Sequence, residues 1–140
     1  MKKVDVSQKV NVPAVNIWNI LRTGTGLDKW LPIIATCKLE GKGAGAKRIC
    51  TTPDGKTLKE TILLVDDTNK VFKYGIDEQD MLPTKNYVGT VSVSESNGQT
   101  EVRWTADFDM TIEDAWPEVE KGLTDILTMA ITSLASAAKP

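Results

Sequence analysis

Two oppositely charged residues flank a short turn near the middle of the chain, and together they could fix the polar end of a ligand or move a proton. Arg48 precedes the run 53–55 (PDG) and Glu60 follows it. A three-residue hairpin loop, with glycine in the left-handed position, would set Arg48 opposite Glu60 on neighbouring strands. Cys50 and Leu58 share the face of this pair, so alternation predicts that both charges point inward. A one-residue bulge would turn them towards water instead, where such pairs are weak, and the sequence leaves both arrangements open.

The chain contains no histidine, and this absence narrows the chemistry that it can perform. It removes the Ser-His-Asp and Cys-His nucleophile systems, the usual general base near neutral pH and the commonest ligand of zinc, copper and haem. Cys37 and Cys50 cannot complete a zinc site alone, and Asp66-Asp67 indicates a polar turn rather than a metal loop. The glycines of 41–45 lack the spacing and the following helix of a nucleotide loop. We therefore expect no metal and no cofactor.

Length and charge exclude further classes of function. A chain of 140 residues, 41% hydrophobic and 26% charged, predicts one domain over residues 1–140 that can bury a core. Its 17 basic and 19 acidic residues are intermixed, which argues against nucleic acid as a partner. No apolar run indicates a signal peptide or a membrane span. We therefore expect a cytoplasmic protein whose two cysteines are reduced, half-buried thiols.

Two hydrophobic periodicities divide the chain into elements that would position these residues. Residues 4–12 alternate valine with polar residues, which predicts a half-buried strand with Gln8 on its apolar face. Pro13 opens a short helix, "PAVNIWNILRTG", and the amphipathic turn "LDKWLP" follows. Between residues 33 and 111, six runs rich in β-branched and aromatic residues are separated by short polar turns. This pattern predicts an antiparallel meander of six strands.

The final third of the chain is typical of one long amphipathic helix. Asp114 is the predicted cap, Pro117 is tolerated in the first turn, and apolar residues such as Leu123 and Leu127 form one stripe. About 24 helical residues would span roughly 36 Å, and only the sheet offers an apolar surface of that length. The predicted fold is therefore α+β: two short helices, and a long C-terminal helix across the concave face of a seven-stranded curved antiparallel sheet. Such a pairing leaves an internal cavity, because a curved sheet and one helix cannot meet everywhere.

Several segments in this order carry a resemblance to a known group of proteins: "CKLEGKGAGAKR", "GKTLKETILLVDD", "LPTKNYVGTVSV" and "TEVRWTADFDM", followed by the amphipathic helix. The chain resembles the polyketide cyclase/dehydrase branch of the START-like (SRPBCC) superfamily over nearly its whole length. These are helix-grip proteins, and the plant abscisic-acid receptors and pollen allergens are more distant relatives. The tightest matches are Arg48, Glu60 and the pair Asn86-Tyr87. The resemblance implies that these positions line or gate a cavity for an apolar or amphipathic ligand, which favours the inward orientation.

Two departures from the relatives limit what the resemblance implies. Ala35 stands where the abscisic-acid receptors place a carboxylate-binding lysine, and the short turn "PDGK" replaces their gate. We therefore do not expect recognition of that hormone. Members that act as aromatase/cyclases have few recognisable catalytic signatures, so the family implies a ligand cavity more strongly than a reaction.

Three functions from different classes follow. The first is binding of a small hydrophobic or amphipathic molecule in the cavity, by a monomer or weak homodimer without nucleic acid or a membrane span. The second is a cyclase or dehydratase without metal or histidine, in which Glu60 moves a proton and Tyr87 donates a hydrogen bond to an enolate. The third is a protein-interaction module like the co-chaperone relatives. The residues predicted to contact a ligand are Gln8, Arg48, Glu60, Phe72, Tyr74, Leu82, Asn86, Tyr87, Trp104, Leu123 and Leu127.

Overall fold

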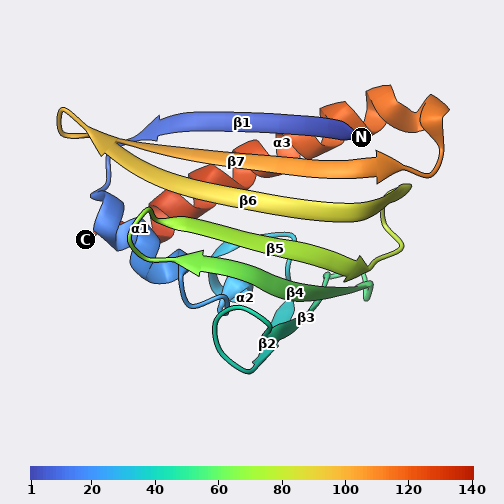
Figure 1. The fold of residues 1–140 in the computed structure, drawn as a ribbon, viewed down its shortest axis with the longest axis horizontal. Coiled ribbons are helices and arrows are strands. Elements are labelled where there is room, and N and C mark those ends of the chain that lie inside the picture. The colour runs from blue at the N-terminus through green and yellow to red at the C-terminus, as the bar shows by residue number, and fades with distance from the viewer.

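The computed structural model describes residues 1–140 and places seven strands in one curved antiparallel sheet (Figure 1). The strand order is β1-β7-β6-β5-β4-β3-β2, so the strands from β2 to β7 follow one another and β1 pairs with β7. This order confirms the predicted meander of six strands after one separate strand. The strands are β1 (Lys2–Val10), β2 (Thr36–Glu40), β3 (Lys47–Thr51), β4 (Thr57–Asp66), β5 (Val71–Glu78), β6 (Thr84–Ser96) and β7 (Gln99–Met110).

Alternation along the strands decides which side of the sheet carries the core. On β7 the apolar residues are buried, while the charged residues between them are not. Each apolar side chain of this strand therefore contributes to one continuous cluster of 31 buried hydrophobic residues. The buried apolar residues of β7 are Val102, Trp104, Ala106, Phe108 and Met110.

The turn between β3 and β4 has the predicted three-residue form. The backbone N–H of Thr52 donates to the carbonyl oxygen of Lys56 at 2.9 Å, and Gly55 has a φ of +88°, in the left-handed region. Arg48 therefore stands opposite Glu60. The irregularities of β4 occur on its other side, against β5, and leave this register intact.

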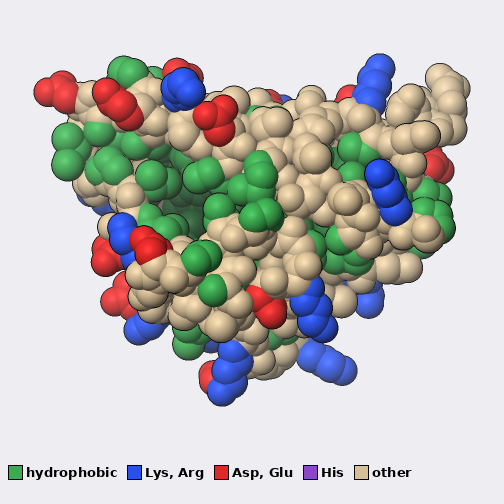
Figure 2. All heavy atoms as spheres, turned by 180° about the vertical axis from the view of Figure 1, so that it is seen from behind, with side chains coloured by type: hydrophobic (Ala, Val, Ile, Leu, Met, Phe, Trp, Pro, Cys, Tyr) green, Lys and Arg blue, Asp and Glu red, His purple; other side chains and the backbone are tan.

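Three α-helices and one 3₁₀ turn complete the fold. The longest helix, α3, crosses behind the sheet (Figure 1) and buries an apolar stripe against it. Pro117 lies in its first turn as predicted, but Asp114 does not cap it, because a 3₁₀ turn precedes the helix and Ala115 occupies the cap position. The side of the molecule that carries the helices is hollowed, and hydrophobic side chains gather around the hollow (Figure 2). The helices are α1 (Ala14–Leu21), α2 (Leu27–Trp30), the 3₁₀ turn η1 (Glu113–Ala115) and α3 (Trp116–Ala137).

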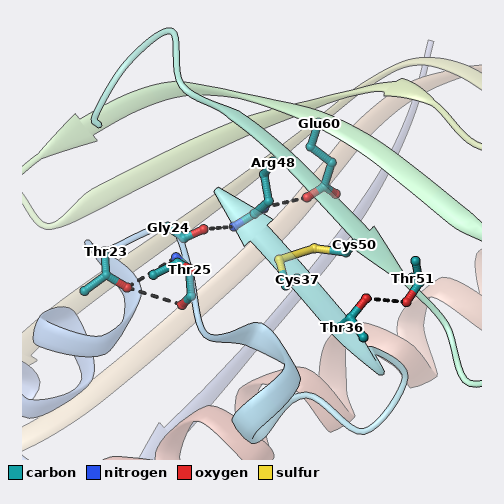
Figure 3. The surroundings of a disulfide bond; sticks show 9 residues. All are labelled: Thr23, Gly24, Thr25, Thr36, Cys37, Arg48, Cys50, Thr51 and Glu60. Carbon is teal, nitrogen blue, oxygen red and sulfur yellow. Dashed lines mark hydrogen bonds and ion pairs between the residues drawn. A yellow bond between two sulfur atoms is a disulfide. The ribbon is translucent and has the colours of Figure 1, made fainter. Parts of the chain in front are cut away.

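A disulfide joins the two strands at the end of the sheet. Cys37 on β2 and Cys50 on β3 occupy directly opposite positions, with their Cα atoms 4.1 Å apart (Figure 3). The expectation of two reduced thiols is therefore wrong. Their spacing in the sequence did not reveal the pairing, because the register of β2 against β3 depends on how the glycine-rich loop between them closes.

None of the helices combines the length and the apolar character that crossing a membrane requires.

Candidate functional site

A cavity of about 110 Å³ lies between the inner face of the sheet, α3 and the segment that contains α2. Hydrophobic residues make up 20 of its 25 lining residues. Three parts of the structure supply the walls: strands β3 to β7, the inward stripe of α3, and the segment from the end of α1 through α2 to β2 together with the connection after β5. The helical and loop residues of the lining are Ile20, Leu21, Thr25, Leu27, Trp30, Leu31, Ile33, Ile34, Gln79, Met81, Leu82, Leu123, Ile126, Leu127 and Ala130.

The Arg48–Glu60 pair forms the charged part of the cavity wall. Arg48 Nε donates to Glu60 Oε1 at 2.7 Å, and Arg48 Nη1 donates to the carbonyl oxygen of Gly24 at 3.0 Å (Figure 3). Only 4% of the arginine side chain and 8% of the glutamate side chain are exposed. The predicted inward orientation is therefore confirmed. Glu60 Oε2 accepts no hydrogen bond from the protein. This oxygen can therefore accept a hydrogen bond from a bound molecule.

Two aromatic rings lie beside the arginine and help to stabilise its positive charge. The guanidinium carbon lies 5.3 Å from the centre of the Tyr74 ring and 5.8 Å from that of Phe72. At these distances the faces of the rings attract a cation. The positive charge of Arg48 is thus compensated by a carboxylate, a carbonyl oxygen and two ring faces. Such contacts allow a charge to be buried.

Two tyrosines give the cavity neutral polar groups. Burial raises the pKa of Tyr74 to about 12, and the charge of Glu60 adds to this rise. Burial also raises the pKa of Tyr87 well above its usual value. Trp104 Nε1 donates to the hydroxyl oxygen of Tyr74 at 3.2 Å. Both phenols therefore stay protonated at neutral pH, and they suit hydrogen bonding better than proton abstraction.

Gly89 on β6 allows the ring of Tyr74 to lie where it does. Gly89 pairs with Tyr74 across the two strands, and a Cβ atom added there would lie 2.2 Å from the ring carbon Cζ. Real contacts of a Cβ are essentially never that short. The tyrosine ring thus occupies the space that a side chain at position 89 would need, and this placement brings its hydroxyl to Trp104.

The connection after β5 is fixed by a single glutamine. Gln79 Oε1 accepts hydrogen bonds from the backbone N–H groups of Met81 and Leu82 at 2.8 and 2.9 Å, and its Nε2 donates to the carbonyl oxygen of Leu82 at 2.8 Å. These bonds hold Met81 and Leu82 against the cavity. Sequence analysis did not identify Gln79, because such local bonding to the backbone is typical of Asn, Asp, Ser and Thr and not of glutamine.

The model of one protein family matches nearly the entire chain. The family is described as "Polyketide cyclase / dehydrase and lipid transport", and residues 1–139 are matched. The chain belongs to this family. Its membership confirms the resemblance found in the sequence, and among curated proteins none matches the chain.

Solved structures of three kinds of protein share the fold. An uncharacterised protein from Bacillus thuringiensis is 24% identical, with 98% of each chain covered and a TM-score of 0.84. The ginseng major latex-like protein 151 from Panax ginseng is 18% identical, with 99% of this chain and 98% of that chain covered and a TM-score of 0.85. Norcoclaurine synthase from Thalictrum flavum is 19% identical, with 97% and 85% covered and a TM-score of 0.78. At these identities the likeness shows the fold, which is the predicted helix-grip arrangement.

Nine of the eleven residues predicted to contact a ligand line the cavity of this family member, and ligand contact itself stays a prediction. Except for Leu82, which lies in the connection after β5, their side chains come from neighbouring strands and from the inward stripe of α3, as alternation and helical spacing indicated. The nine are Arg48, Glu60, Phe72, Tyr74, Leu82, Tyr87, Trp104, Leu123 and Leu127.

The other two predicted residues do not line this cavity, and contact of either with a ligand stays a prediction. Gln8 Nε2 donates to the carbonyl oxygen of Thr128 on α3 at 2.9 Å, which ties β1 to the helix beyond the cavity. Asn86 is exposed, has a φ of +54° and donates to Asp109 at 2.9 Å. The strand register shifts between Lys85 and Val88, so simple alternation does not hold at Asn86.

Proposed function

We propose that this protein binds a small hydrophobic or amphipathic molecule in the cavity between the sheet and α3. The observation that carries the proposal is a predominantly apolar cavity that contains one buried ion pair, Arg48 and Glu60. Apolar walls supply affinity, and a few fixed polar groups supply orientation, which is the usual composition of a small-molecule site.

The comparisons support a ligand of this kind. The family description names lipid transport beside cyclase and dehydrase activities. Norcoclaurine synthase, which shares the fold, was solved in complex with dopamine and hydroxybenzaldehyde. Both observations concern relatives, and they favour an apolar or aromatic molecule over a metal ion or a nucleic acid here.

The size of the cavity restricts what it can hold without rearrangement. Its volume of about 110 Å³ lies below the roughly 300–1,000 Å³ of pockets for drug-sized ligands. A larger molecule therefore needs one wall to move. The helix α2 is suited to this, because none of its residues is buried, although Leu27 and Trp30 line the cavity.

Native mass spectrometry of the purified protein, looking for a small molecule that co-purifies with it, tests this proposal. Binding of the dye 1-anilinonaphthalene-8-sulfonate to Ala130→Leu gives a second test, because Ala130 lines the cavity from α3 and the larger side chain fills it. We expect dye binding to weaken by about tenfold or more in Ala130→Leu. The exposed Ala137 provides the control, since Ala137→Leu adds the same atoms outside the cavity. Equal dye binding by both variants, with no co-purifying molecule, would contradict the proposal.

A cyclase or dehydratase is the second candidate, because a carboxylate and a phenol line the same cavity. Glu60 would move a proton, and the protonated Tyr87 would donate a hydrogen bond to an enolate oxygen. The substitution Glu60→Gln separates the two functions. A binding protein keeps its ligand with altered affinity, whereas the enzyme loses turnover while binding is retained. Turnover of polyketide-like substrates that survives Glu60→Gln would remove Glu60 from the mechanism.

The protein-interaction module and the oligomeric state stay predictions. The large apolar residues exposed on β3 and β4 are few: Ile49, Leu63 and Leu64. Their small number favours the cavity over the outer surface as the functional site.

A further inference from the structure

Trp30 carries the one buried polar side-chain atom of the protein that has no hydrogen-bond partner, its indole Nε1. Two other tryptophans have partners: Trp18 Nε1 donates to Asp67 at 2.8 Å, and Trp104 Nε1 donates to Tyr74. Buried donors are nearly always paired, because an unpaired donor loses its bond to water and gains nothing in exchange. The exception therefore calls for a partner that is not part of the chain.

The position of Trp30 indicates which molecule that partner is. Trp30 lies at the end of α2 and lines the cavity. The other polar groups of the wall are largely occupied, since Arg48 binds Glu60 and Gly24, and Gln79 binds its own loop. Most of the remaining lining is hydrophobic, and none of its polar groups accepts a hydrogen bond from Trp30 Nε1. A molecule that enters the cavity can bring an acceptor.

We propose that the ligand is a small, mainly apolar molecule of about one aromatic ring that carries a hydrogen-bond acceptor such as a carbonyl, and that Trp30 Nε1 donates to this acceptor. The inference rests on the proposed binding function and adds the chemical class of the ligand. The size is limited by the volume of about 110 Å³, which is smaller than the roughly 150 Å³ of a cavity that holds benzene, so even a single ring requires one wall to move. Because this N–H is buried, the movement of α2 that admits the ligand must also turn the indole N–H towards it.

Two nearly isosteric molecules test the inference directly: acetophenone, which has a carbonyl, and α-methylstyrene, which has a CH₂ group in place of the oxygen. Their affinities are measured by NMR titration of protein labelled with ¹⁵N at the tryptophan indoles. We expect acetophenone to bind about fivefold to tenfold more tightly, which is the usual net effect of one hydrogen bond. Among the indole N–H signals, that of Trp30 should move downfield with acetophenone and not with α-methylstyrene.

The substitution Trp30→Phe keeps an apolar ring and removes the donor, so it should abolish the preference for acetophenone. Comparing the two molecules within one variant cancels any change in packing or stability that the substitution causes. Trp116→Phe is the matched control, because Trp116 lies outside the cavity, and the preference should persist there.

Three outcomes separate the failure of this inference from that of the binding function. Equal affinities for both molecules, or a preference that survives Trp30→Phe, would overturn the role of Trp30 and leave the binding function standing. Binding of neither molecule, while the dye still binds and Ala130→Leu weakens it, would overturn the ligand class alone. Loss of dye binding as well would overturn both.

Discussion

Arg48 and Glu60 face each other inside the protein, and each compensates for the burial of the other. Each alone would be a buried charge without compensation, and the desolvation of such a charge costs several kcal/mol. Together they share a hydrogen bond of 2.7 Å, and the arginine also binds Gly24 in the segment before α2. The pair therefore links the sheet to the wall of the cavity that we expect to move.

The substitution Arg48→Met should strongly destabilise the protein at neutral pH. It leaves Glu60 without its partner at a site where 8% of the side chain is exposed, and breaking such pairs costs about 3–5 kcal/mol. The loss should shrink in mild acid, because the stranded carboxyl group can then take up a proton. The double variant Arg48→Met/Glu60→Leu should recover much of the loss. Chemical denaturation of the three proteins at pH 5 and pH 7.5 measures these differences.

An exposed ion pair of the same type provides the control. Arg103 and Asp5 join β7 and β1 through two hydrogen bonds, and both side chains are exposed. Arg103→Met should change stability little and with little dependence on pH. If Arg48→Met behaves in the same way, with additive effects in the double variant, Arg48 and Glu60 leave the proposed site.

Gly89→Ala should displace the ring of Tyr74, because a Cβ at position 89 would overlap it. We expect a lower melting temperature and loss of the Trp104–Tyr74 hydrogen bond, visible as a shift of the Trp104 indole N–H signal. Gly75→Ala is the control, since its Cβ would make only ordinary contacts, at 3.5 Å from Leu63. Similar effects of the two substitutions would show that strand glycines in general, and not the overlap with Tyr74, are responsible.

The residues of the site differ in how far the sequence could predict them. The pairing of Arg48 with Glu60 was predictable from the turn chemistry, whereas alternation left their orientation open and the resemblance favoured the inward one. Asn86 was placed by the resemblance, and the register shift between Lys85 and Val88, which the sequence does not reveal, leaves its side chain exposed. Trp30 was not predicted, since a helix of four residues is too short to display a period. Its unpaired N–H depends on neighbours that are distant in the sequence.

At the scale of elements, the link between β2 and β3 should contribute measurably to stability. The disulfide closes a segment with a sequence separation of 13, and a loop of about that length corresponds to roughly 3 kcal/mol at most. Reduction with dithiothreitol should therefore lower the melting temperature. The double variant Cys37→Ser/Cys50→Ala should start from the lower value and ignore the reductant. Two free thiols in the untreated protein, with a melt that dithiothreitol does not change, would contradict the disulfide.

The elements themselves were mostly predictable, and their ends less so. Each strand alternates over enough residues to reveal its period, and the stripe of α3 repeats over several turns. The start of α3 was misplaced because η1 uses backbone bonds where a side-chain cap was expected. The disulfide was missed because the pairing of two strands across a flexible loop is a long-range property. The residue pattern within one strand does not show which residue of another strand it faces.

At the scale of the whole molecule, the sheet and α3 depend on each other. The buried stripe of α3 includes Val119, Leu123, Leu127, Ile131 and Leu134. Without the sheet this stripe would face water, and without the helix the inner face of the sheet would do so. The extent of the domain, residues 1–140 as one unit, remains a prediction that this mutual dependence supports.

Removal of residues 113–140 should therefore leave a chain that unfolds or aggregates. Burying a large aliphatic side chain is worth about 1.5–3 kcal/mol. The burial of the five side chains in the stripe therefore contributes a free energy comparable with the net stability of a whole domain, about 5–15 kcal/mol. Removal of residues 139–140 alone is the control, because both are exposed, and it should leave the melting curve unchanged. Size-exclusion chromatography and thermal melts of the two truncated proteins measure this. A long truncation that stays monomeric and melts sharply would show that the sheet folds without α3, and the cavity would then lose the wall on which the proposed binding depends.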